Sequence, residues 1–208
     1  NKEGEMALVT YVAERVQKIF NIDLTTLFST TPLNLDVSFG NPRFKKPKNH
    51  NERIANAYTF YAHYLSLLVL QATPDLKTTP LPTRAKDLHQ EIIQTTGSVT
   101  FENVLHFAWQ RGVAVLPLND SGNFHGACWR ENYRNIIVIK PQVNYDAYWL
   151  FNLLHEIKHA ADSPEQSDLS VVEAGRDKEW LILEDEQKAN DFAGNTMLEG
   201  RAIELVQE

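Results

Sequence analysis

Apolar residues recur at every third or fourth position in several stretches of the chain, which is the period of an amphipathic helix. This pattern predicts helices at residues 5–20, 52–73, 83–97, 100–111, 144–161 and 180–199. The second of these helices is strongly apolar, so we expect it to be buried against the rest of the molecule. It ends before Pro74, because a proline disfavours helical backbone in the residue that precedes it. Thr83 is expected to cap the third helix, and Gly97 is expected to end it.

Shorter apolar runs lie between the later helices and are expected to form strands. They cover residues 113–118, 124–129 and 135–140. Two segments have little periodicity and are interpreted as loops: residues 21–51, with a basic cluster that we expect to be solvated, and the polar segment after residue 161 that contains Pro164 and Gly175. Helices combined with a small three-stranded sheet predict an α+β fold.

Prolines at positions 74, 80 and 82 mark a linker between two parts of the chain. We therefore place a boundary there. Residues 1–82 are expected to form a mostly helical N-terminal region with its linker, and residues 83–208 the domain that contains the sheet.

Composition narrows the class of protein. The chain has 208 residues, of which 43% are hydrophobic and 23% charged, as is usual for a globular protein. Its net charge of -7 argues against direct nucleic-acid binding by this segment, because such binding relies on clustered Lys and Arg. The longest apolar stretch, residues 58–70, is too short to span a membrane. Cys128 is the single cysteine, which excludes a disulfide framework within the chain and favours a cytoplasmic location.

The motif that carries chemistry is His-Glu-x-x-His at residues 155–159. Residues four apart lie on the same face of a helix, so His155 and His159 can bind one zinc ion. Glu156 lies beside them, where it can activate a water molecule. Buried histidines without partners are costly, which favours a metal, although two histidines satisfied within a metal-free core remain an alternative.

A catalytic zinc site needs a third protein ligand. Glu186 is the preferred candidate, because Asn190 lies one turn later on the same predicted helix and can hydrogen-bond a ligand histidine. Ala189 and Ala193 are small enough to let this helix approach the histidine helix closely. The other acidic candidates for the third ligand are Asp162, Glu165, Glu173, Glu179 and Glu184.

The pairing of His-Glu-x-x-His with a later Glu-x-x-Ala-Asn-x-Phe-Ala resembles the ImmA/IrrE-type metallopeptidases, and more broadly the gluzincins. The resemblance covers residues 84–198 and includes Trp109–Val115, Ser121–Gly126 and Asn135–Lys140. Lys158 stands where family members usually have Gly or Ala. The family's metal ligands fall on His155, His159 and Glu186, its general base on Glu156, and its ligand-orienting residue on Asn190.

This resemblance implies a zincin-like domain with Zn²⁺ as its cofactor and a protein as its substrate. Family members often follow a DNA-binding helix-turn-helix and act in repressor, stress-response or toxin–antitoxin regulation. A transcriptional regulator is therefore an expected substrate, and because the chain starts at Asn1, such a module can precede it. The alternative function is a non-catalytic, zinc-stabilised regulatory or interaction domain.

Further residues are candidates for contact with a substrate. The segment that contains His125, Gly126 and Ala127 is expected to be an edge strand on which an extended peptide could pair, or else an ordinary edge strand. The candidates for stabilising an oxyanion are His125, Tyr133, Tyr145 and Tyr148. The remaining histidines have no ligand-like spacing and are interpreted as structural, and Cys128 as a small packed residue.

Overall fold

The fold combines helices with one mixed sheet. The computed structural model describes residues 2–20, 22–30, 50–118, 124–140, 143, 145–174 and 184–199. In this part of the chain the helices are α1 (Lys2–Phe20), α2 (Leu24–Leu27), α3 (His50–Ala72), α4 (Ala85–Thr96), α5 (Phe101–Gln110), α6 (Asp146–Ala161) and α7 (Glu184–Met197). The strands are β1 (Ala114–Pro117), β2 (Phe124–Glu131), β3 (Arg134–Ile139) and β4 (Leu169–Ala174). The predicted α+β class is confirmed.

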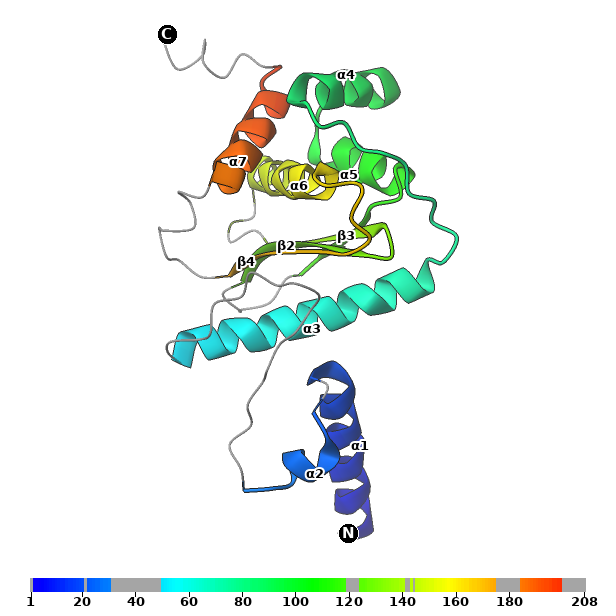
Figure 1. Ribbon diagram of the computed structural model, residues 1–208, viewed down its shortest axis with the longest axis vertical. Coiled ribbons are helices and arrows are strands. Elements are labelled where there is room, and N and C mark those ends of the chain that lie inside the picture. The colour runs from blue at the N-terminus through cyan, green and yellow to red at the C-terminus, as the bar shows by residue number, and fades with distance from the viewer. Residues whose placement is uncertain are drawn as a thin grey trace.

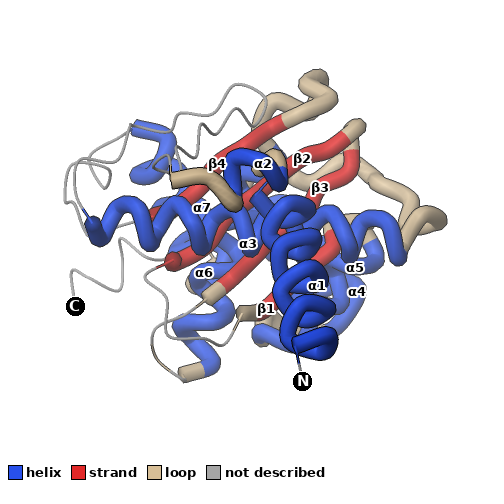
Figure 2. The backbone as a smooth tube through the Cα atoms, turned by 90° about the horizontal axis from the view of Figure 1, so that it is seen from below, coloured by secondary structure: helices blue, strands red, loops and turns tan. Residues whose placement is uncertain are grey.

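The sheet has the strand order β1-β3-β2-β4, in which β1 runs parallel to β3 and the other neighbours are antiparallel (Figure 2). Strands β2 and β3 form a hairpin whose last pair is Glu131 with Arg134. The two loop residues, Asn132 and Tyr133, have φ angles of 50° and 64°. Positive φ at both loop residues is typical of a turn whose twist matches that of the strands it joins.

Helices cover both faces of this sheet (Figure 1). Side chains alternate along each strand, so Ile137 and Ile139 of β3 join the core on the α6 side, whereas Ile136 and Val138 join the core on the α3 side. Helices α4, α5 and α7 lie on the α6 side, and α3 lies along the opposite face (Figure 1). The predicted burial of the second helix is confirmed, because Ala62 and Leu70 of α3 pack on the sheet.

Strand β4 corrects the predicted three-stranded sheet to four strands in the described part of the chain. It lies in the segment that was predicted to be a polar loop. Leu169, Ser170, Val171 and Val172 are each only half-buried, and among the described strands β2 is the one partner of β4. Apolar and polar residues do not alternate regularly along β4. Its position in the sheet therefore depends on pairing with β2 rather than on its own sequence.

Several predicted boundaries also change. Helix α4 begins at Ala85 after an Arg84 N-cap, so the prediction that Thr83 caps it is wrong, whereas Gly97 does end it with a φ of 85°. Most of the predicted loop at residues 21–51 lies outside the described residues, but α2 forms within it. The division between residues 1–82 and 83–208 stays a prediction. Helix α3, which belongs to the first of these two parts, shares a core with the sheet.

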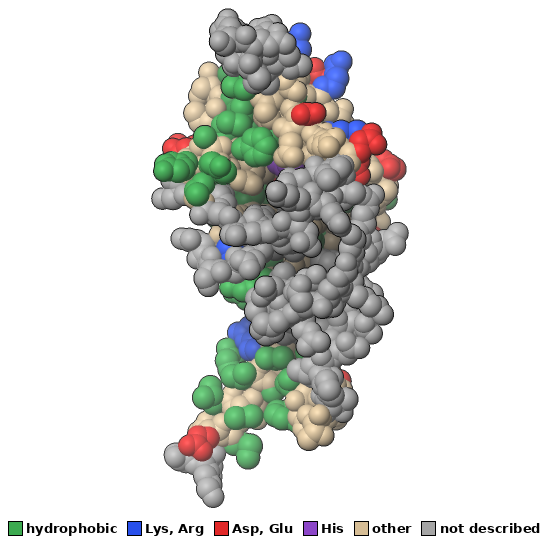
Figure 3. Space-filling view, turned by 90° about the vertical axis from the view of Figure 1, so that its left-hand side faces the viewer, with side chains coloured by type: hydrophobic (Ala, Val, Ile, Leu, Met, Phe, Trp, Pro, Cys, Tyr) green, Lys and Arg blue, Asp and Glu red, His purple; other side chains and the backbone are tan. Residues whose placement is uncertain are grey.

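Helix α1 has the predicted amphipathic pattern but keeps much of its apolar surface exposed, as Figure 3 shows for the lower part of the molecule. Met6 and Leu8 are 69% and 62% exposed, whereas Ala13 is buried. Within the described residues, none of the helices has the length and apolar character needed to cross a membrane.

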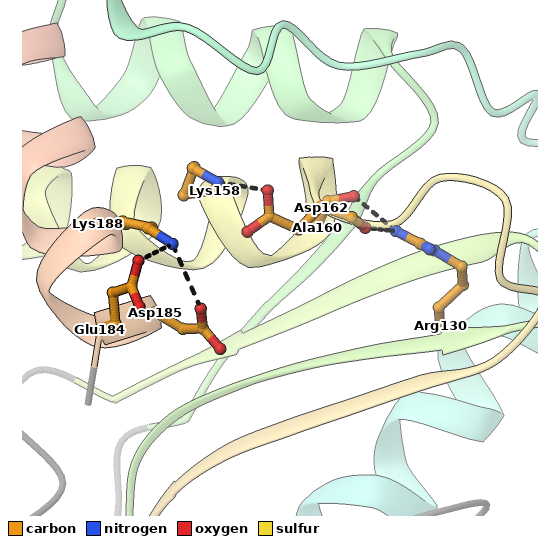
Figure 4. A network of polar contacts seen from close by, with 7 residues as sticks. All are labelled: Arg130, Lys158, Ala160, Asp162, Glu184, Asp185 and Lys188. Carbon is orange, nitrogen blue, oxygen red and sulfur yellow. Dashed lines mark hydrogen bonds and ion pairs between the residues drawn. The ribbon is translucent and has the colours of Figure 1, made fainter.

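Two arginines of the β2–β3 hairpin fix the ends of the helices on either face. Arg130 is 2% exposed, and its guanidinium donates hydrogen bonds to Ala160 O at 2.8 Å and Asp162 O at 3.0 Å, at the end of α6 (Figure 4). It also donates to Ser163 O and Gln166 O in the following turn. Arg134 donates to Leu70 O and Thr73 O at the end of α3. The hairpin therefore sets where both helices end.

Replacing Arg130 by Met should lower the free energy of unfolding by roughly 3 kcal/mol, because the buried carbonyl group of Ala160 and three partly buried carbonyl groups lose their donor. Equilibrium denaturation in urea measures this change. Arg84→Met is the control: the side chain of Arg84 is 80% exposed and pairs with Asp87 on the surface, so the expected change is below about 0.5 kcal/mol. Equal effects of the two substitutions would contradict the role given to Arg130.

Candidate metal centre

Helix α6 brings the predicted motif into the interior. The helix packs between the sheet and the outer helices, and apolar residues such as Leu153 and Leu154 are fully buried. His155 and His159 are each 4% exposed, and Glu156 is 1% exposed. A helix with polar groups buried this deeply must satisfy them with hydrogen bonds, with charges or with a metal.

The side chains of His155, His159 and Glu186 meet at one point between α6 and α7. The two Nε2 atoms of the histidines lie 3.1 Å apart. Glu186 Oε2 lies 3.3 Å from His155 Nε2, and Glu186 Oε1 lies 3.7 Å from His159 Nε2. Among the described residues, these three form the group of His, Cys, Asp and Glu side chains whose ligand atoms lie close enough to hold a metal.

These separations fit a zinc ion. Ligand atoms about 2.0–2.1 Å from a tetrahedral zinc lie about 3.3 Å from one another, close to the separations of 3.1, 3.3 and 3.7 Å. Within the described part of the chain, the buried Glu186 Oε2 has no hydrogen-bond partner despite its closeness to His155. Two histidine nitrogens and one carboxylate, of which one oxygen lacks a hydrogen-bond partner, match the ligands that zinc prefers.

Asn190 orients one of the histidines. Its Oδ1 lies 3.0 Å from His155 Nδ1. Because an amide oxygen only accepts hydrogen bonds, Nδ1 carries the proton and the lone pair of Nε2 faces the cluster. Asn190 lies one turn after Glu186 on α7, and the small residues Ala189 and Ala193 on the same helix are fully buried. The geometry expected for this helix is present.

The charge of Glu186 is set by its neighbours. Burial raises the pKa of its carboxyl group, but the adjacent imidazoles of His155 and His159, when they are protonated, outweigh burial and lower that pKa to about 2. Glu186 is therefore a carboxylate at any pH near neutrality, as a metal ligand must be.

The other acidic candidates lie elsewhere or outside the described side chains. Glu184 is 82% exposed and pairs with Lys188 at 2.7 Å, and Asp162 pairs with Lys158 (Figure 4). Glu165 is exposed in the turn after α6. The side chains of Glu173 and Glu179 lie outside the described part of the structure. Lys158 is held by Asp162 four residues later on α6, so its charge is partly balanced.

One interpretation of the sequence is wrong: the segment around Gly126 is not an edge strand. Strand β2 pairs with β3 on one side and with β4 on the other, and Gly126 itself lies opposite Ile139 and Glu173. The backbone of β2 is therefore already used by neighbouring strands and does not offer an edge to a peptide. The side chain of His125 lies outside the described part, and contact of Gly126 or Ala127 with a substrate stays a prediction.

The three tyrosines that are candidates for stabilising an oxyanion lie on the surface. Tyr133 is 57% exposed in the β2–β3 turn, and Tyr145 and Tyr148 are 68% and 56% exposed at the start of α6. Their proposed role stays a prediction. Sequence reasoning missed Arg130, whose signal is an arginine directly after the uncharged run Gly126–Trp129 of the same strand.

Cys128 is buried on β2, as predicted for a packed residue. Burial raises the pKa of its thiol well above 9.0, and the charge of Glu156 raises it further. A raised pKa leaves little thiolate at pH 8, so alkylation by iodoacetamide should be at least about a hundredfold slower in the native protein than in urea. Mass spectrometry of the labelled cysteine measures the two rates, and comparable rates would show that the thiol is accessible.

Substitutions of Glu186 and of its exposed neighbour Glu184 test which of the two glutamates binds the metal. Glu186→Ala should cost most of the affinity for zinc, because it removes one of three converging ligand atoms. Glu184→Ala, two residues earlier on the same helix, should leave the affinity within a few-fold, because Glu184 is on the surface. Competition with a chromophoric chelator measures both affinities. The reverse order would place the third ligand elsewhere.

Comparison of the chain with protein-family models, with curated proteins and with solved structures finds no match. The family resemblance thus depends on the residues of the two motifs and their spacing. The structure adds that His155, His159 and Glu186, which come from two separate helices, meet in one buried cluster.

Proposed function

We propose that this chain is a zinc-dependent peptidase that cleaves a specific protein partner. The observation that carries the proposal is the convergence of His155, His159 and Glu186, with Glu156 buried on the helix that carries the two histidines. The resemblance to ImmA/IrrE-type metallopeptidases supports the same assignment and favours a zincin-like domain in a regulatory setting. A transcriptional regulator is the partner class that this resemblance suggests.

Each residue has a defined part in the proposed chemistry. When bound, zinc would lower the pKa of water towards 7 and polarise the carbonyl of a peptide bond. His155, His159 and Glu186 would bind the ion, and Asn190 keeps His155 in the tautomer that can do so. The carboxylate of Glu156 would take the proton from the attacking water and deliver it to the leaving amine.

A second candidate function is a regulatory or interaction domain that zinc stabilises without catalysis. The nearly complete burial of all three ligand side chains favours this candidate, because structural zinc sites are usually closed. Both candidates require the same ligands, so loss of a ligand does not separate them. Glu156 separates them, because a structural site has no use for a proton acceptor.

Glu156→Gln should abolish most of the proposed activity while leaving zinc bound. The substitution keeps the volume of the side chain and removes its ability to accept a proton, so the rate of cleavage should fall by about a hundredfold to ten-thousandfold. The assay combines the chain with candidate partner proteins, and looks for one discrete cleavage that a chelator stops and added zinc restores. Zinc content is measured by elemental analysis of the same samples.

Outcomes of this experiment separate the two candidates. If the Glu156→Gln protein binds zinc and retains full activity or full regulatory output, the peptidase assignment is wrong. The zinc-stabilised domain would then remain, and His155→Ala should remove its output by loosening the fold.

A further inference from the structure

One face of β2 lies directly against the helix that carries the motif. Gly126, Cys128 and Arg130 alternate along this strand and share the α6 side of the sheet. Cys128 belongs to the core formed with α6, and Arg130 donates a hydrogen bond to Ala160 O at the end of α6. Gly126 therefore faces the middle of α6, where the motif begins.

The space above Gly126 is filled by the carboxylate of Glu156. A Cβ atom placed on Gly126 would lie closer than 3.0 Å to Glu156 Oε1, a separation that real Cβ atoms essentially never show, and 3.2 Å from Glu156 Cδ. Its next neighbour, Val138 O at 3.4 Å, is an ordinary contact. The positive-φ glycines of the described chain are Gly97 and Gly112, so the backbone at Gly126 would accept any residue. Glu156 is the obstacle.

We propose that Gly126 is a positioning residue for Glu156: the missing side chain provides the place against β2 in which the carboxylate rests. This inference depends on the proposed peptidase function, because it concerns the base of that reaction. It gives Gly126 a role different from pairing with a peptide, for which its backbone is already engaged by β3 and β4. A methyl group at this position would push the carboxylate away from β2.

The substitution Gly126→Ala should displace the base without preventing folding, because the atom it meets is the mobile end of a side chain. Zinc affinity should stay within a few-fold, since His155, His159 and Glu186 are untouched. Cleavage should fall by about tenfold or more, because small misplacements of a reacting group are costly. The same substitution made in the Glu156→Gln protein should cause no further loss, since the base is already absent.

Cys128 offers a readout that needs neither activity nor metal. It is the single cysteine of the chain and is fully buried near Glu156, so its S–H stretching band reports the local field of that carboxylate. Infrared spectra should show this band shifted in the same direction by Gly126→Ala and by Glu156→Gln. Gly194→Ala on α7 is the matched control, because a Cβ there meets no atom within 4 Å, and it should leave the band, zinc affinity and cleavage unchanged.

The outcomes distinguish this inference from the proposed function. Full activity of Glu156→Gln would remove the peptidase assignment, whereas an unshifted band with wild-type cleavage in Gly126→Ala would overturn the role of Gly126 alone. A loss of zinc affinity above about tenfold in Gly126→Ala would also overturn it, because the glycine would then act on the ligands. If Gly126→Ala fails to fold, the inference requires that Gly126→Ala combined with Glu156→Ala folds, and failure of both contradicts it.

Discussion

Burial of polar side chains on α6 is the constraint on which most of the structure depends. Two histidines and a glutamate of this helix are almost inaccessible to solvent, and each would be costly to bury without a partner. Helix α7 supplies partners for the histidines, a carboxylate and an amide. Strand β2 leaves room at Gly126 for the carboxylate of Glu156.

The β2–β3 hairpin determines where α6 and α3 lie on the sheet. Its two-residue turn fixes the register of both strands, and the register decides which side chains face α6 and which face α3. Arg130 and Arg134 then hold the ends of those helices by their carbonyl groups. Helix α6 therefore lies at a fixed position along β2, which keeps Glu156 beside Gly126 and the histidines towards α7.

The charges within the cluster are compatible with the metal centre that we propose. The carboxylate of Glu186 lies next to two imidazoles, and Asn190 directs the Nε2 lone pair of neutral His155 towards it, so a cation between them would interact favourably with both. A metal ion would replace the close approach of two histidine nitrogens by two bonds to a cation. For this reason we expect zinc to stabilise the folded chain as well as to complete the proposed site.

The sequence by itself determined those features that depend on local periodicity and side-chain chemistry. The helices with strong apolar stripes were predicted, as were the strands of the hairpin, because their apolar residues recur at the period of their own element. The histidine pair also follows from sequence, since a spacing of four places both residues on one helical face. The choice of Glu186 over Glu184 followed from Asn190 one turn later, and the structure places Glu186 in the cluster and Glu184 on the surface.

Only the tertiary structure decided what depends on residues far apart in the chain. Strand β4 was missed because its half-buried residues carry a weak pattern and its pairing with β2 supplies its structure. The prediction of an edge strand around Gly126 is wrong for the same reason, since an edge is defined by the absence of a neighbouring strand and not by the strand's own residues. The contact between Gly126 and Glu156 likewise exists only once α6 is packed on the sheet. Local sequence fixes the period of an element, whereas the neighbours of that element are fixed by packing.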